Sequence, residues 1–134
     1  MPELVPHYDH ACAMVGDDDL DHRILSHYRS ASALGCSQAV WLGEGGPPLV
    51  RNYDFPLHKV TGRIEPSRWS GRRVIAKAQR PWGGCLDGMN DEGLAASCTL
   101  GGFGRRGEGF AIILTLRYLL ETFARRPLRS AVCR

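Results

Sequence analysis

The sequence lacks the cysteine patterns that mark disulfide frameworks and metal sites. Its five cysteines are an odd number, and no Cys-x-x-Cys pair or cysteine–histidine cluster occurs. Structural zinc sites draw their ligands from such closely spaced pairs, so we expect no metal. Unpaired thiols are typical of reducing compartments, and we therefore expect a cytoplasmic protein.

Long apolar runs and strong charge are also missing. No uninterrupted apolar stretch reaches membrane-spanning length, and no basic segment followed by an apolar one begins the chain. The formal net charge is only +3, and the basic residues are scattered without an aromatic platform. The sequence therefore predicts neither a membrane nor a nucleic acid as partner.

What the sequence does contain is a cysteine that a hairpin can bring close to charged residues. Cys36 follows Gly35 and precedes Arg51 and Asp54. The segment 38–53 has two β-prone stretches around a Gly- and Pro-rich turn, which predicts antiparallel strands. Nearby positive charge favours the thiolate that a nucleophilic cysteine needs, and a carboxylate can orient a guanidinium or a substrate group.

The remaining pattern predicts an α+β fold, with antiparallel strands followed by a packed helix. Asn90 lies where two strands must turn and is interpreted as a turn residue. The glycine-rich segment 101–109 lacks the Lys-Ser/Thr ending of a phosphate-binding loop. The expected elements are a polar loop over 58–70, strands over 72–78, 82–87 and 94–100, and an apolar-striped helix over 110–124 that Pro127 ends.

The first 35 residues differ in character from the rest. An acidic run over 17–21 could cap a short helix over 20–28. The prefix also carries four histidines whose spacing matches no common metal site, and we interpret them as surface residues. They are His7, His10, His22 and His27.

Three segments taken together resemble the N-terminal-nucleophile hydrolases of the choloylglycine hydrolase and penicillin acyltransferase (peptidase C45) group. They are Gly35-Cys36-Ser37, the Arg-Asn-Tyr-Asp-Phe stretch 51–55, and the Asp-Gly-Met-Asn-Asp-Glu-Gly-Leu-Ala stretch 87–95. The resemblance covers about Leu25 to Phe123. It implies part of an αββα sandwich with antiparallel sheets, and no metal or organic cofactor. Carried over residue by residue, it implies Cys36, Arg51 and Asp54 as catalytic residues.

The resemblance also implies self-processing. Cleavage between Gly35 and Cys36 would free an α-amino group, whose pKa near 8 suits a general base at neutral pH. Residues 1–35 would then be a pro-segment. Residues 36–134 would be the N-terminal portion of a catalytic domain that is apparently truncated, because members of the group are longer. Thr99 lies near the position of an oxyanion-binding residue in bile-salt hydrolases, although a core-strand role is an equal alternative.

The expected function is that of a linear amide C–N hydrolase or an acyltransferase acting through an acyl-enzyme on Cys36. Its partner would be a small-molecule amide or acyl thioester, and the sequence leaves the substrate and a homo-oligomeric state open. Two alternatives also stay open. One is an inactive truncated fragment of such an enzyme, and the other is a small binding domain.

Overall fold

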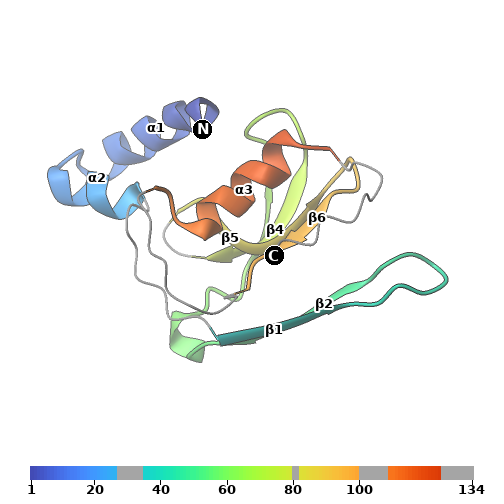
Figure 1. Cartoon of the computed structure of the whole chain (residues 1–134). Coiled ribbons are helices and arrows are strands. Elements are labelled where there is room, and N and C mark those ends of the chain that lie inside the picture. Colours follow the sequence, from blue (N-terminus) through green and yellow to red (C-terminus); the bar gives the residue numbers. More distant parts are fainter. Residues whose placement is uncertain (27–34, 80–81, 100–108, 125–134) are drawn as a thin grey trace.

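A computed structural model of the chain describes residues 1–26, 35–79, 82–99 and 109–124 (Figure 1). Most of the glycine-rich segment and Pro127 lie outside the described residues. The elements are η1 Pro2–Leu4, α1 Val5–Val15, α2 Asp19–Leu25, β1 Gly35–Val40, β2 Leu49–Asp54, η2 Leu57–Lys59, β3 Ile64–Ser67, β4 Val74–Gln79, β5 Gly84–Asn90, β6 Ala95–Ser97 and α3 Ile112–Thr122.

Strands β1 and β2 form the predicted antiparallel hairpin. Its register pairs Cys36 with Tyr53 and Gly35 with Asp54. The strand begins at Gly35, three residues before the β-prone stretch that the sequence indicated. Cys36 therefore sits inside a strand, and the residues opposite it are fixed by the hairpin register.

Strands β3 to β6 form a four-stranded antiparallel sheet in sequence order. The prediction of β4, β5 and β6 is confirmed, but the prediction of a polar loop over 58–70 is wrong for part of its length. Residues 64–67 form β3, and Pro66 pairs with Ile75 of β4. A proline is tolerated there because β3 is an edge strand, where a missing N–H breaks no second ladder.

The core lies between this sheet and α3, which crosses one face of it (Figure 1). The predicted apolar stripe of α3 supplies the core residues on the helix side, and two thiols help to fill the sheet side. The buried cluster consists of Val74, Ala76, Cys85, Cys98, Leu116 and Leu120. Burial of such side chains contributes roughly 25 cal/mol per Å² of apolar surface. The protein thus has the expected α+β fold with antiparallel sheets.

The prefix forms two helices on the side of the sheet where α3 lies (Figure 1). The predicted helix is confirmed as the shorter α2, and the side chain of Asp18 caps it by accepting a hydrogen bond from the Asp21 N–H at 2.8 Å. Helix α1 was not predicted, because Cys12 is its one buried residue and no apolar stripe marks it. The part of the chain that the structure describes contains no helix with the length and hydrophobicity needed to cross a membrane.

Candidate active site

The guanidinium of Arg51 joins the thiol of Cys36 to a carboxylate of the four-stranded sheet. Arg51 Nη2 donates to Cys36 Sγ at 3.1 Å, and Arg51 Nη1 donates to Asp87 Oδ2 at 2.8 Å. The Arg51 side chain is only 7% exposed, against 31% for that of Asp87. The hairpin brings Arg51 to Cys36, and side-chain contacts between β2 and the four-stranded sheet bring Arg51 to Asp87 and Tyr53 to Lys77.

The electrostatics of the site favour a permanent positive charge beside the thiol. Burial disfavours the charged guanidinium of Arg51, but its hydrogen bonds to Cys36 and Asp87 leave its pKa above the ordinary value. An adjacent cation favours the thiolate form of a cysteine. Cys36 is half-buried, and it is the one described thiol that contacts this cation.

The core thiols have a different environment. Cys85 is buried, and burial raises its pKa to about 12. Burial likewise raises the pKa of Cys98 above its ordinary value. Both thiols therefore stay protonated at neutral pH, which is typical of inert cysteines.

Asp54 lies at the other side of the site. It is exposed, it stands opposite Gly35 in the hairpin register, and its Oδ1 accepts a hydrogen bond from Asn52 Nδ2 at 2.6 Å. The carboxylate that pairs with Arg51 is that of Asp87, whereas Asp54 pairs in register with Gly35.

Thr99 contacts the backbone of the cysteine. Its Oγ1 donates to the carbonyl oxygen of Cys36 at 3.3 Å. Of the predicted site residues, Arg51 and Thr99 each contact Cys36, and Asp54 lies opposite Gly35 in the hairpin.

Two stacked aromatic rings, those of Tyr53 and Phe55, lie beside the Arg51 guanidinium. The Arg51 guanidinium lies over the ring of Tyr53 at 5.0 Å, and Lys77 Nζ lies over the same ring at 5.1 Å. Tyr53 stacks on Phe55 with ring centroids 5.4 Å apart. Burial raises the pKa of Tyr53 above its ordinary value. A cavity of about 610 Å³ is lined by Arg51, Tyr53, Ile75, Lys77, Asp87 and Met89, among others.

Two other aromatic residues, Trp41 and Trp82, lie away from Cys36 and Arg51. Trp41 is 72% exposed, beyond the end of β1. Trp82 stacks on Trp69 at 5.5 Å and donates from Nε1 to the carbonyl oxygen of Leu25 at 3.0 Å, on the side of the prefix helices. Tyr53 and Phe55 are therefore the aromatic residues that border Cys36 and Arg51.

Sequence reasoning missed the role of Asp87. The residue opens the 87–95 stretch on which the resemblance rested, so a signal was present, but no partner could be assigned to it from the sequence. Asn90 of the same stretch is the last residue of β5, and it holds the predicted turn because its Oδ1 accepts hydrogen bonds from the backbone N–H groups of Glu92 and Leu94.

A family model for acyl-coenzyme A:6-aminopenicillanic acid acyl-transferase matches residues 41–125, more than half of the chain. The matched range contains Arg51, Asp54, Asp87 and Thr99, and Cys36 lies five residues before it. Curated proteins gave no match, and neither did solved structures.

Proposed function

The chain belongs to the acyl-coenzyme A:6-aminopenicillanic acid acyl-transferase family, and from that premise we propose that Cys36 is the nucleophile of an amide hydrolase or acyltransferase. The observation that carries the proposal is the 3.1 Å hydrogen bond from Arg51 Nη2 to Cys36 Sγ. A half-buried thiol beside a buried cation is the environment in which a cysteine becomes reactive. The substrate is a small-molecule amide or acyl thioester.

The reaction proceeds in two acyl transfers. The Cys36 thiolate attacks the carbonyl carbon, and the C–N or C–S bond of the substrate breaks as the departing amine or thiol takes up a proton. The acyl group is then a thioester on Cys36. Water or an amine attacks that thioester, loses a proton, and restores the thiolate. Water makes the protein a hydrolase, and an amine makes it an acyltransferase.

Self-cleavage between Gly35 and Cys36 supplies the general base. The freed α-amino group of Cys36 is close to its own thiol and has a pKa suited to proton transfer near neutral pH. Asp54 faces Gly35 in the hairpin register and is exposed. We propose that its carboxylate holds the ammonium form of the new amino group.

Arg51 and Asp87 position the thiol and stabilise its charge. The Nε atom of Arg51 and the hydroxyl of Tyr53 are buried without a hydrogen-bond partner in the described part of the chain. Both can donate to a carbonyl oxygen that gains negative charge during acyl transfer. Thr99 fixes the Cys36 backbone through its 3.3 Å hydrogen bond.

The proposal is tested on the natural gene product with two cysteine variants. Cys36→Ala removes the proposed nucleophile, and Cys98→Ala is the matched control because Cys98 is a buried core thiol. We expect intact mass to show loss of residues 1–35 in the wild type and in Cys98→Ala, but not in Cys36→Ala. Hydrolysis of a chromogenic amide should follow the same pattern. Turnover by Cys36→Ala would exclude Cys36 as nucleophile.

A further inference from the structure

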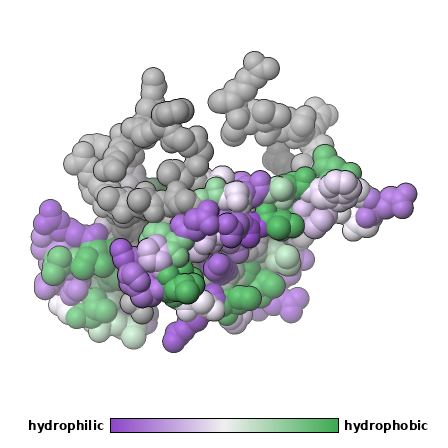
Figure 2. Space-filling view, turned by 90° about the horizontal axis from the view of Figure 1, so that it is seen from below, coloured by the Kyte–Doolittle hydropathy of each residue, from purple (hydrophilic) through white to green (hydrophobic). Residues whose placement is uncertain are grey.

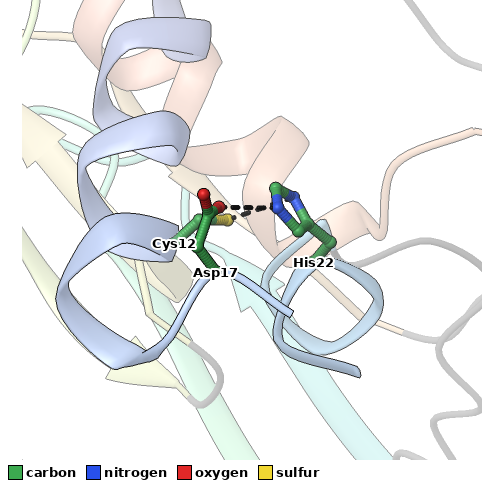
Figure 3. A group of neighbouring side chains, drawn as sticks. All are labelled: Cys12, Asp17 and His22. Carbon is green, nitrogen blue, oxygen red and sulfur yellow. Dashed lines mark hydrogen bonds and ion pairs between the residues drawn. The ribbon is translucent and has the colours of Figure 1, made fainter. Parts of the chain in front are cut away.

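A second cluster of chemically reactive side chains lies in the prefix, where α1 meets α2 (Figure 3). The ring of His22 contacts a carboxylate through one nitrogen and a thiol through the other. His22 Nε2 is 2.7 Å from Asp17 Oδ1, and His22 Nδ1 is 3.5 Å from Cys12 Sγ. One ligand atom from each of the three residues lies within 4.8 Å of the others.

A tight chain reversal creates this cluster. Helix α1 ends at Val15 with Gly16 as its C-cap, and Asp17 follows with φ of 60°, a left-handed conformation that aspartate tolerates better than most residues. The Asp17 N–H donates to the carbonyl oxygen of Cys12 at 3.0 Å, and Asp18 then starts α2. This chain reversal therefore holds Asp17 close to the C-terminal end of α1 and directs α2 back toward α1.

The donor set suits a transition metal of the zinc class. Thiolate, imidazole and carboxylate are the groups that zinc takes from proteins. Zinc–sulfur and zinc–nitrogen bonds of about 2.3 and 2.05 Å, set at a tetrahedral angle, separate sulfur and nitrogen by about 3.5 Å. The observed distance from Cys12 Sγ to His22 Nδ1 is 3.5 Å.

The exposure of the ligand side chains and the hydrogen bonds already made by His22 are both compatible with entry of a metal ion. Cys12 is fully buried, whereas the side chains of His22 and Asp17 are 42% and 63% exposed. An ion can therefore approach from their side. The Tyr8 hydroxyl lies 2.7 Å from His22 Nδ1 and also donates to the His22 carbonyl oxygen at 3.1 Å. It can keep the second contact when a metal takes the ring nitrogen.

We propose that Cys12, Asp17 and His22 bind one divalent transition-metal ion of the zinc class, which links α1 to α2. Binding forms a bond from the metal to Cys12 Sγ and releases the thiol proton to solvent. Affinity therefore falls as the pH is lowered. The site is separate from Cys36 and does not take part in the proposed acyl transfer.

Cobalt(II) is the probe for this site, because a thiolate ligand gives it a charge-transfer band in the near ultraviolet. The titration uses the full chain with Cys36→Ala, so that residues 1–35 stay attached and the reactive thiol is absent. We expect one equivalent to bind, and zinc(II) to displace it and raise the melting temperature by mass action.

Two variants in that background decide the assignment. His22→Gln removes a partly exposed ligand, which spares the fold, and Cys12→Ser removes the thiolate. Each should weaken cobalt binding by about tenfold or more, and Cys12→Ser should abolish the thiolate band. His10→Gln, an exposed histidine on α1, is the matched control and should bind as the parent does. Absence of the band in the parent, or its persistence in both variants, would overturn the proposal.

Discussion

At the residue scale, Arg51 contacts Cys36, but the carboxylate that it pairs with belongs to Asp87 and not to Asp54. The sequence placed Arg51 near both Cys36 and Asp54, because all three belong to one hairpin. The structure pairs Arg51 with Asp87, which comes 36 residues later. That contact is set by the packing of the hairpin on the four-stranded sheet, so the pattern of the hairpin alone could not indicate it.

Asp87→Asn should therefore slow the acyl-transfer reaction while the protein still folds. The change leaves the buried Arg51 without its counter-charge. Breaking a buried ion pair costs about 3–5 kcal/mol, and the partial exposure of Asp87 places the expected loss of stability near 3 kcal/mol. We also expect slower alkylation of Cys36 by iodoacetamide at neutral pH, because the guanidinium is no longer held beside the thiol.

The measurements are single-turnover kinetics, alkylation rates across pH, and thermal melting. Asp91→Asn is the control, because Asp91 pairs with the largely exposed Arg73 beyond the end of β5. Wild-type alkylation and turnover rates in Asp87→Asn would show that Asp87 does not position Arg51.

At the element scale, Asn90 connects the β5–β6 turn with the end of α3. Its side-chain N–H groups donate to the carbonyl oxygens of Leu120 and Phe123 at 2.8 and 2.7 Å. Its Oδ1 accepts from two N–H groups of the turn. The sequence predicted the turn correctly, but the contact with α3 depends on where the helix packs on the sheet.

Asn90→Ala should destabilise the protein and leave the contacts of Cys36 unchanged. Each buried polar group left without a partner costs about 1–3 kcal/mol, and solvent can reach some of the groups freed here, so we expect a loss near 3 kcal/mol in total. Urea unfolding followed by circular dichroism measures this loss. Glu92→Ala, an exposed change in the same turn, is the control and should cost less. Equal stability of the two variants would contradict a role for Asn90 in holding α3.

At the scale of the whole molecule, the face of the sheet opposite α3 and the hairpin beside it expose large apolar side chains. Figure 2 views the molecule from below and shows hydrophobic areas among hydrophilic ones. Large exposed apolar patches favour association. The exposed residues of this region include Trp41, Leu42, Val50, Ile64, Ile75 and Met89.

The 134-residue chain should consequently self-associate, and charges on this face should reduce the association. Ile75 and Met89 are paired across β4 and β5, so Ile75→Glu with Met89→Lys can form a cross-strand ion pair and keep the net charge. Light scattering after size exclusion measures the mass at several concentrations. Met14→Lys with Val15→Glu, two exposed positions on α1, is the matched control. A monodisperse monomer in the unchanged chain would contradict the expectation.

The sequence by itself determined the elements whose pattern is local. Alternating β-prone stretches around turn residues predicted the β1–β2 hairpin and the β4–β5–β6 meander, and helical spacing of apolar residues predicted α3. The Gly- and Pro-rich connection over 41–48 was enough to bring Arg51 to Cys36, because the register of a hairpin follows from its turn and its alternation.

Only the tertiary structure decided which distant side chains meet. β3 was missed because an edge strand containing Pro66 carries little strand signal, and α1 was missed because it buries a single residue. The pairing of Asp87 with Arg51 and the meeting of Cys12 with His22 depend on how two elements pack together. Side-chain periodicity fixes the faces of one element, but it does not fix which face of another element will lie against it.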